Sequence, residues 1–306
     1  MGFKLAILHS TPRPSWSSVQ LLNAAVREGV EGHYILWDYI AVRNSEECRV
    51  LYQDRCFPFD AVIVRGLGRG LTLDRFLYRY SVLKALEEDG VVVVNPADSI
   101  FLARNKLLSL LQLKSCNIPV PYTFATENPA HAIRFAENEE VVVKPIMGSL
   151  GLGSFRVKGI DAAYHVINFL AQLGQPIYMQ RYVEKKGNRD IRVMVVGGRV
   201  IAAIYRYAGE GEWKTNIARG GRPRPAHIGL EVEDIAVKAT SCLKLVYSGV
   251  DIIESTNGKL YVVEVNASPL WRGLLKATGI NPAIHIVRET VLLAINKREA
   301  RKIRKI

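Results

Sequence analysis

The dipeptide Asn257-Gly258 restricts the fold of this chain more than any other feature, because Asn-Gly favours the tight two-residue turn of a β-hairpin. Mostly apolar runs flank it on both sides, at 250–253 and 260–265. Pairing across this turn places Asp251 directly opposite Glu264, and Asn266 lies two residues further along the same face. We therefore expect an antiparallel sheet in this part of the chain, with two carboxylates facing each other.

Two carboxylates that face each other across a hairpin repel, so the arrangement needs a cation, a proton or a basic side chain. Three oxygen donors with no softer ligand nearby suit Mg²⁺ or Mn²⁺, with water and phosphate oxygens completing the octahedral shell. We interpret Asp251, Glu264 and Asn266 as metal ligands. The alternative is an exposed hairpin face with ordinary acidic residues, and the apolar neighbours of Glu264 argue against it.

A second feature is a glycine-rich segment that follows a lysine at the end of an apolar strand. Lys144 precedes Gly148, Gly151 and Gly153 in the order Lys-x3-GxxGxG. This order differs from the Walker loop, whose lysine follows the glycines, and from the GxGxxG dinucleotide turn. A lysine that ends a buried strand usually extends to solvent. Beside a glycine loop and upstream of a metal triad, Lys144 instead predicts a phosphate-binding site.

The first 96 residues alternate strand and helix patterns and predict a parallel sheet with crossover helices. The first strand is followed by a turn without glycine at 9–14, so we expect no dinucleotide site there. We expect one helix at 98–116, a small αβ unit at 122–183 around the strand 141–144, and a closing helix near 282–295. A hairpin at Gly197-Gly198 precedes the one at Asn257-Gly258.

Composition narrows the class of protein. The 306 residues suffice for two or three modest domains, and the longest apolar runs have the length of strands, so we expect no membrane span. We expect no signal peptide and, since the four cysteines lack CxxC spacing, no disulfide framework and a reduced, cytoplasmic setting. The net charge of +12 predicts attraction to nucleotides, nucleic acids or carboxylate-rich metabolites without choosing among them.

The segment after the first hairpin is polar and glycine-rich, and it concentrates donors for phosphate or carboxylate. It includes Lys214, Thr215, Asn216 and Arg219, and the preceding hairpin begins with Asp190 and Arg192. Taken alone, such a segment fits a solvated basic loop equally well.

In this order the residues resemble an ATP-grasp carboxylate–amine ligase of the RimK-like branch, which adds glutamate or another amino acid to an acidic acceptor. The resemblance covers nearly the whole chain. Its motifs are Lys106, Lys144 with the glycine loop, Arg181-Tyr182, Asp190-Ile191-Arg192, Lys214-Thr215-Asn216, Arg219-Gly220-Gly221, Asp251 and Glu264-Val265-Asn266-x-Ser268-Pro269. Within that branch, Val64–Gly68, Val94-Asn95-Pro96 and Ser268–Gly273 are most similar to the archaeal tetrahydromethanopterin:α-L-glutamate ligases.

The resemblance implies an α/β fold, α+β in parts, with three subdomains. These would be an N-terminal parallel αβ domain at 1–96, a small αβ lid with the glycine loop at 97–183, and a C-terminal antiparallel-sheet domain with the metal site at 184–306. It also implies ATP and Mg²⁺ or Mn²⁺, with two ions, as cofactors.

Each motif residue receives a role from this resemblance. Lys106 and Lys144 would neutralise phosphates under the loop that contains Gly148, Ser149, Gly151 and Gly153. Adenine would lie at Arg181 and Tyr182, largely against backbone groups, and the ribose near Asp190. Lys214, Thr215 and Asn216 would belong to the nucleotide site. The catalytic residues would be Arg192, Asn216 and Arg219, which would line the transferring phosphoryl group and the acceptor carboxylate.

The implied reaction is phosphoryl transfer to a carboxylate, which gives an acylphosphate, followed by attack of an amine. L-Glutamate and an acidic small-molecule acceptor would be the partners, and a homo-oligomer is left open. Arg181 stands where the branch commonly has an acidic residue. Trp271 and Arg272 differ from the usual glycine-containing segment and suggest a flat, acidic acceptor such as a carboxylated pterin.

Two alternatives stay open at this point. One is the same chemistry on an amino-group carrier protein or a ribosomal protein. The other, from a different class, is a nucleic-acid-binding protein that uses the basic and aromatic run at 75–80 and the basic C-terminal segment. No RNA-binding fingerprint supports the second alternative.

Overall fold

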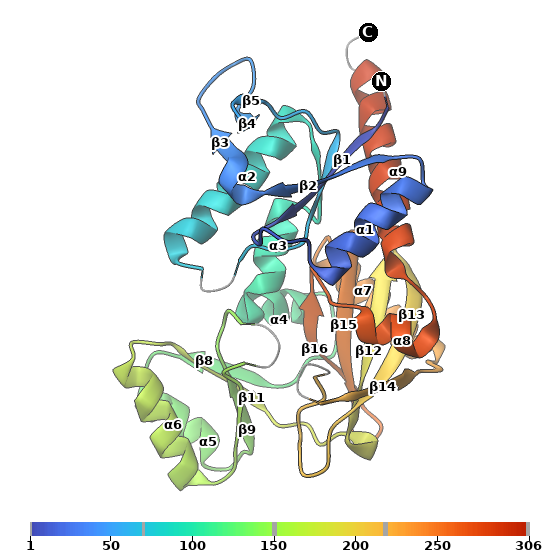
Figure 1. Cartoon of the computed structure of the whole chain (residues 1–306). Helices are drawn as coiled ribbons and strands as arrows, with labels where there is room; N and C mark the ends of the chain where they lie inside the picture. Colours follow the sequence, from blue (N-terminus) through green and yellow to red (C-terminus); the bar gives the residue numbers. More distant parts are fainter. Residues whose placement is uncertain (1, 69–70, 149–151, 217–219, 304–306) are drawn as a thin grey trace.

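The computed structural model describes residues 2–68, 71–148, 152–216 and 220–303. Three larger sheets form its framework: a parallel sheet in the upper part of Figure 1, a five-stranded antiparallel sheet below it, and a small antiparallel sheet at the lower left. The predicted α/β class with several sheets is confirmed. The small sheet with its two helices forms a separate lobe in Figure 1, and we call this lobe the lid.

The N-terminal sheet has the order β2-β1-β6-β7, and its strands run parallel as predicted. Its strands are β1 (Lys4–His9), β2 (Glu31–Leu36), β6 (Ala61–Val64) and β7 (Val92–Val94), crossed by α1 (Trp16–Arg27) and α2 (Leu73–Asp89). β1 and β6 lie in the middle and are buried because helices cover both faces. The sequence patterns missed β2, whose residues are only half-buried, and the small sheet β3 (Ile40–Val42), β4 (Val50–Tyr52) and β5 (Arg55–Cys56).

The single helix predicted at 98–116 is wrong, since the structure has two helices there. α3 (Ala97–Arg104) ends at Asn105, and α4 (Lys106–Ser115) begins directly after it. Asn105 has an extended backbone, and its side chain accepts a hydrogen bond from the N–H of Leu108 at 3.0 Å. Asn105 is thus the N-cap of α4, a role that asparagine favours. The break places Lys106 at the first position of a helix.

The lid sheet has the order β10-β9-β11-β8 and is antiparallel. It consists of β8 (Thr123–Thr126), β9 (Val141–Lys144), β10 (Phe155–Val157) and β11 (Ile177–Arg181), covered by α5 (Pro129–Ala136) and α6 (Ile160–Gln172). The predicted αβ unit at 122–183 is thus present, with the strand 141–144 as predicted. The glycine loop stands in the chain between β9 and β10, and β10 is an edge strand of the lid sheet.

The C-terminal sheet has the order β14-β13-β12-β15-β16. Both predicted hairpins are present: β12 (Arg189–Val196) with β13 (Arg199–Tyr207), and β15 (Tyr247–Glu254) with β16 (Leu260–Asn266). β14 (Arg222–Pro225) forms the edge, and α7 (Leu230–Cys242) packs on the sheet.

The register of the second hairpin agrees with the prediction at the acidic residues but not beside the turn. Glu254 pairs with Leu260, which is one residue out of step with a two-residue turn. An irregularity after Asp251 then leaves Val263 as an extra residue and restores the pairing of Asp251 with Glu264. The predicted opposition is confirmed, but it needs a β-bulge, which a hairpin pattern alone does not reveal.

The C-terminal helices pack back onto the N-terminal sheet. α8 (Arg272–Thr278) precedes α9 (Pro282–Ile303), which runs beside α1 (Figure 1). Arg288 pairs with Glu28 at 2.8 Å, and Arg298 pairs with Asp60. One hydrophobic cluster joins residues of β1, α1 and α9. The N-terminal and C-terminal parts thus share a core, and the domain boundaries at 96 and 183 stay a prediction.

The cysteines overturn the prediction that they form no disulfides. Cys48 is bonded to Cys56, and Cys116 to Cys242, so all four are paired. The second pair joins the end of α4 to the end of α7 across 126 positions, a proximity that only the fold creates. The prediction of a reduced, cytoplasmic setting loses its cysteine argument and stays a prediction.

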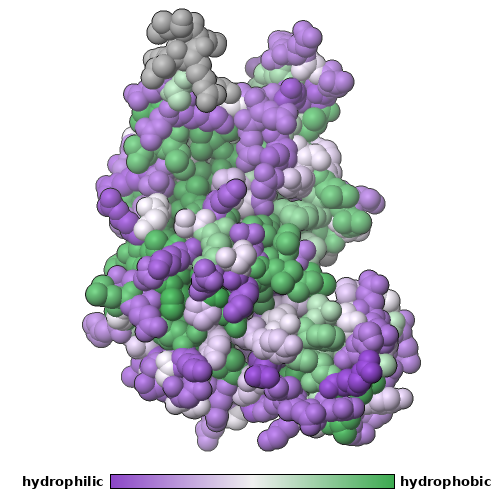
Figure 2. All heavy atoms as spheres, turned by 180° about the vertical axis from the view of Figure 1, so that it is seen from behind, coloured by the Kyte–Doolittle hydropathy of each residue, from purple (hydrophilic) through white to green (hydrophobic). Residues whose placement is uncertain are grey.

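The surface shows hydrophilic and hydrophobic side chains in alternation. In the view from behind, hydrophilic residues interrupt the hydrophobic ones over the whole face that is seen (Figure 2). Among the residues that the structure describes, no helix combines the length and apolar character needed to cross a bilayer.

Candidate active site

A pocket lies between the lid sheet and the C-terminal sheet, and it gathers most side chains predicted to bind a nucleotide. The predicted residues that line it are Lys106, Lys144, Gly148, Arg181, Tyr182, Asp190, Lys214, Thr215, Asn216, Asp251 and Glu264. Arg192 and Asn266 belong to the same strands as its lining residues, and Gly153 lies between two of them. Ser149, Gly151 and Arg219 lie outside the described residues.

The bulge in β16 shapes the pocket, because it lets two consecutive side chains face it. In a regular strand Val263 and Glu264 would point to opposite faces. Both line the pocket, as do Asp251 and Ile253 from the neighbouring strand. An apolar slot next to the carboxylates is formed by Val263 and Ile253, together with Val142 of β9 on the lid side.

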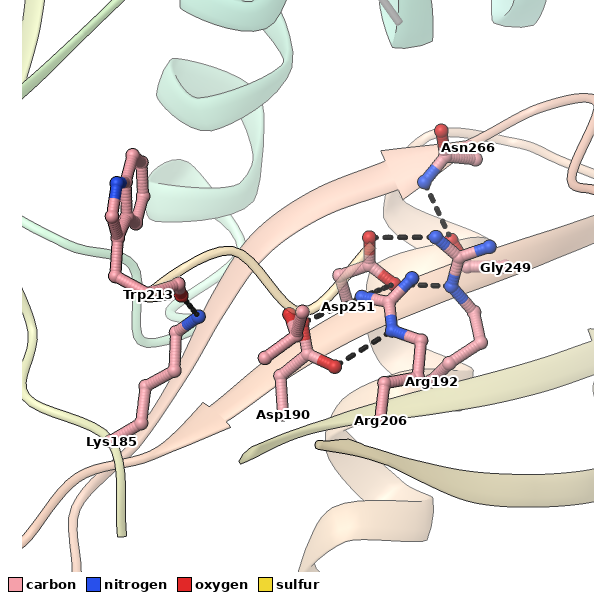
Figure 3. Close-up of polar contacts among 9 residues, drawn as sticks. Lys185, Asp190, Arg192, Arg206, Trp213, Gly249, Asp251 and Asn266 are labelled. Carbon is pink, nitrogen blue, oxygen red and sulfur yellow. Dashed lines mark hydrogen bonds and ion pairs between the residues drawn. The ribbon is translucent and has the colours of Figure 1, made fainter. Parts of the chain in front are cut away.

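Asp251 is the centre of an ion-pair network in this pocket (Figure 3). Its side chain is 4% exposed, and Arg192 on the paired strand donates to both of its oxygens, with Nη2 at 2.8 Å from Oδ2. Arg206 Nη2 lies 3.1 Å from Oδ1. Burial alone would raise the pKa of Asp251, but the charges of Arg192 and Arg206 outweigh burial and hold that pKa below its usual value.

Asp190 extends this network from the next position along the face of β12. It is 5% exposed and accepts from Arg206 Nε at 2.7 Å and Nη2 at 2.6 Å, and also from the Thr215 hydroxyl. The two carboxylates together raise the pKa of Arg206 against the effect of its burial. The geometry gives Asp190 the task of fixing Arg206 and the 213–216 segment. A contact with a ribose stays a prediction.

The two predicted phosphate lysines come from different elements, since Lys106 begins α4 and Lys144 ends β9 of the lid. Lys106 Nζ donates to Gly148 O at 2.8 Å and lies 3.5 Å from Glu264 Oε1, so it bridges the glycine loop and the second carboxylate. Lys144 donates to the Gln180 side chain. Burial is the main cause that lowers the pKa of Lys144 to about 8; the charges of Glu264 and Asp251 act against this shift, and those of Lys106 and Lys185 act with it.

Lys185 is a functional candidate that the sequence analysis missed. It lines the pocket, donates to Trp213 O at 2.7 Å and has its pKa lowered by burial (Figure 3). Arg206, Gln180 and Trp213 were likewise not proposed as site residues. The only signal was position: Lys185 follows β11, which ends at Arg181, and Arg206 lies opposite Asp190 across the first hairpin.

Arg181 and Tyr182 lie where the chain leaves β11, and their backbone N–H groups are already hydrogen-bonded. Arg181 N–H donates to Tyr122 O at 2.8 Å and Tyr182 N–H to Glu140 O at 2.7 Å. The Arg181 guanidinium turns outward to pair with Glu139. These two N–H groups are therefore already bonded, and the next residue, Val183, lines the pocket as well.

Two glycines of the site are required by close contacts. A Cβ on Gly221 would lie 2.2 Å from Thr215 O, and one on Gly148 would lie 2.9 Å from Pro145 Cγ. Because Gly221 has no side chain, its backbone can approach that of Thr215 closely beside the pocket.

The oxygen donors of the pocket suit a divalent metal ion. Glu264 and Asn266 share one face of β16, and Asn266 donates through Nδ2 to Gly249 O at 3.3 Å, which leaves its carbonyl oxygen available (Figure 3). Within the described residues no group of three His, Cys, Asp or Glu side chains could hold a metal, so the set would be two carboxylates and one amide. All-oxygen donors fit Mg²⁺, with Asp251 shared between metal and guanidinium groups.

Trp271 does not offer an aromatic face to an acceptor, which corrects the expectation drawn from the sequence. Its side chain is 1% exposed and lies beneath the Arg65 guanidinium, 4.6 Å from the ring centre. Arg272, by contrast, is exposed and lies over Trp16.

Comparison with known sequences agrees with this geometry. The RimK-like ATP-grasp domain matches residues 103–290. A tetrahydromethanopterin:α-L-glutamate ligase of Methanocaldococcus jannaschii is 40% identical over 78% of this chain and 82% of its own length. A ribosomal protein bS6–L-glutamate ligase of Escherichia coli is 35% identical over 93% of this chain and 94% of its own.

Solved structures show the same fold. The ATP-grasp ligase PsnB, in complex with a precursor variant, Mg and ADP, superposes with a TM-score of 0.76 at 20% identity, covering 95% of this chain and 98% of that one. A RimK domain ATP-grasp protein of Sphaerobacter thermophilus has a TM-score of 0.69 at 20% identity, over 94% and 99% of the two chains.

Proposed function

The chain belongs to the RimK-like ATP-grasp family, and on this premise we propose that it joins the amine of L-glutamate to a carboxylate of an acidic small-molecule acceptor, at the expense of ATP. The acceptor carboxylate is first phosphorylated to an acylphosphate, and the amine then displaces phosphate to form the amide. The observation that carries the proposal is the pocket itself, in which Lys106, Lys144 and Lys185 surround the opposed Asp251 and Glu264.

ATP fits this pocket because the lining offers both apolar and basic side chains. The apolar slot of Val142, Ile253 and Val263 suits a flat base, and the lysines suit phosphates. Lys106 and Lys144 would bind phosphate oxygens, with Lys185 as a third basic contact. Arg206 is held by two carboxylates, so it serves the network more than the ligand.

Mg²⁺ would be held by Asp251, Glu264 and Asn266, and it would neutralise the terminal phosphates during transfer. We propose two ions, and Mn²⁺ as a substitute. Arg192, Asn216 and Arg219 would bind the transferring phosphoryl group and the acceptor carboxylate. A charged guanidinium at this position stabilises negative charge on oxygen, so the reaction needs no nucleophilic side chain.

A small-molecule acceptor is favoured over a protein by the relative named for tetrahydromethanopterin, which has the higher identity of the two described above. The bS6 ligase keeps a protein acceptor as the second candidate. The nucleic-acid alternative loses support, because Phe76 and Arg79 of the basic and aromatic run are buried in the N-terminal core. That run therefore forms no continuous exposed surface.

The test is ADP release from ATP and Mg²⁺ with a metabolite mixture, with and without labelled glutamate, followed by mass spectrometry of the products. We expect ADP release that depends on both glutamate and an acceptor, and a product heavier by one or more glutamate residues. ATP turnover that ignores both would contradict the proposal.

A further inference from the structure

Three segments without any acidic residue meet beside the pocket. They are residues 9–18 after β1, residues 65–68 after β6, and residues 268–276 after β16, and they contain Arg13, Arg65, Arg272 and Lys276. β1 and β6 are adjacent parallel strands, so the first two segments leave the same edge of the sheet. We call this meeting point the basic junction.

Direct contacts hold the basic junction together. Arg65 Nη2 donates to Ser17 Oγ at 3.2 Å and to Pro269 O at 2.8 Å, which links all three segments. The Arg65 guanidinium stacks on Trp271 at 4.6 Å, and Trp271 meets Trp16 edge-on at 6.3 Å. The exposed Arg272 covers the other side of Trp16 at 5.2 Å.

The charges of the basic junction have no counter-ions in the described residues. Arg65 is 6% exposed, yet it bonds only neutral oxygens, and no carboxylate pairs with Arg13 or Arg272 there. Two buried donors also lack acceptors in the described part of the chain, Arg65 Nε and Trp271 Nε1. Buried arginines are normally paired with acids, so this cluster is a place where an anion from outside would be stabilised.

His9 adds a neutral donor to the basic junction. Its Nδ1 accepts from the N–H groups of Ser10 at 2.9 Å and Thr11 at 3.1 Å, so the ring proton lies on Nε2. The ring packs against Gly66, where a Cβ would lie 3.1 Å from Nε2. Burial and the Arg65 charge both lower the pKa of His9, which agrees with this neutral form.

The basic junction borders the proposed site of chemistry. A Cβ on Gly249 would lie 2.7 Å from Pro269 Cβ and 3.2 Å from Arg192 Nη1, so these two side chains converge over Gly249. Arg192 binds Asp251, and Pro269 O binds Arg65. A molecule bound at the basic junction would thus lie close to Arg192.

From this placement we propose that the basic junction binds additional carboxylates of the acceptor, and that Arg272 and Arg13 select acceptors that carry several negative charges. The inference rests on the proposed function. It names the acceptor class as a polycarboxylate, with the reacting carboxylate near Arg192 and the others between Arg13, Arg65 and Arg272.

Calorimetric binding of tri-L-glutamate at low salt tests this inference, with Mg²⁺–ADP titrated separately. We expect Arg272→Glu and Arg13→Glu each to weaken tri-L-glutamate binding by about tenfold or more, because each reverses a charge that would contact a carboxylate. Mg²⁺–ADP binding should stay within about twofold in both variants, because neither Arg13 nor Arg272 lines the pocket proposed for the nucleotide. Arg134→Glu is the matched control, since Arg134 is an exposed arginine on α5 of the lid.

The inference would be overturned if Arg272→Glu and Arg13→Glu both bound tri-L-glutamate as tightly as the wild type. It would also be overturned if Arg134→Glu lost as much affinity for tri-L-glutamate as they do. Wild-type protein that binds Mg²⁺–ADP but shows no saturable binding of tri-L-glutamate would overturn it as well. Failure of the wild-type protein to bind Mg²⁺–ADP would instead contradict the proposed function. Retention of binding in Arg272→Lys, with loss in Arg272→Glu, would attribute the effect to charge.

Discussion

Arg192 and Asp251 stand directly opposite each other on β12 and β15, and the guanidinium binds both carboxylate oxygens through Nε and Nη2. The sheet register fixes this pair before any ligand binds. Asp251 also faces Glu264 on its other side. Arg192 is therefore the resting counter-ion of a carboxylate that we propose also binds metal.

Removal of this counter-ion should strengthen metal binding. In Arg192→Met, Asp251 keeps Arg206 but has one oxygen freed, so we expect Mn²⁺ affinity without nucleotide to rise roughly tenfold while turnover falls. Electron paramagnetic resonance of free Mn²⁺ measures the affinity. Arg189→Met is the control, because Arg189 lies on the same strand and pairs with Glu254 instead. Unchanged or weaker Mn²⁺ binding in Arg192→Met would contradict this competition.

Asp251→Asn should affect stability and activity together. The change leaves Arg192 without its buried charge partner, while Arg206 keeps Asp190, and we expect a cost of about 3–5 kcal/mol of unfolding free energy. We expect ADP release to fall by about a hundredfold or more, since a metal ligand is lost. Glu254→Gln, near the surface, should cost less than about 1 kcal/mol. Denaturant unfolding and ADP assays measure both effects, and undiminished turnover in Asp251→Asn would refute the metal assignment.

Lys144 predicts a pH dependence, because burial lowers its pKa to about 8. The unfolded lysine titrates near 10.4, so the unfolded chain binds more protons between these values and this residue adds stability as pH rises from 8 to 10.4. Phosphate binding depends on pH in the opposite direction. It weakens as pH rises, because it needs the protonated amine of Lys144. We expect Mg²⁺–ADP affinity to fall as pH rises above about 8, and to fall less in Lys144→Arg. The same pH profile in both proteins would show that Lys144 does not control it.

Much of this site could be predicted because its residues lie on regular elements. The Asn257-Gly258 turn and strand alternation bring Asp251 to Glu264, and the end of β9 brings Lys144 to the pocket. The bulge at Val263 could not be foreseen, and the agreement at Asp251 depends on it. Hairpin patterns assign a face and a partner, but not an inserted residue.

Residues brought in by tertiary contacts escaped prediction. Lys185 lies on an irregular segment, and Trp271 is an aromatic residue whose burial depends on packing under Arg65. The disulfide of Cys116 and Cys242 likewise joins two helices far apart in sequence. The missed helix break at Asn105 has a local cause, since asparagine within an apolar helical pattern serves equally as an N-cap.

The Cys116–Cys242 bond should contribute strongly to stability. It closes a loop of 126 positions, and the chain-entropy relation gives about 5 kcal/mol for such a loop. We expect Cys116→Ser to lower the melting temperature far more than Cys48→Ser, whose bond spans only 8 positions. Thiol titration of the denatured, unreduced protein should find no free thiol. Four free thiols per chain would show that the bonds do not form in the isolated protein.

The central claim is that an acceptor carboxylate is activated by transfer of the terminal phosphoryl group of ATP. The direct measurement is to label the carboxylates of the acceptor with ¹⁸O and analyse the released phosphate by mass spectrometry, with ATP, Mg²⁺ and L-glutamate present. Formation of an acylphosphate predicts one ¹⁸O atom in each phosphate released, together with ADP. Amide product accompanied by unlabelled phosphate, or by AMP and pyrophosphate, would contradict the account.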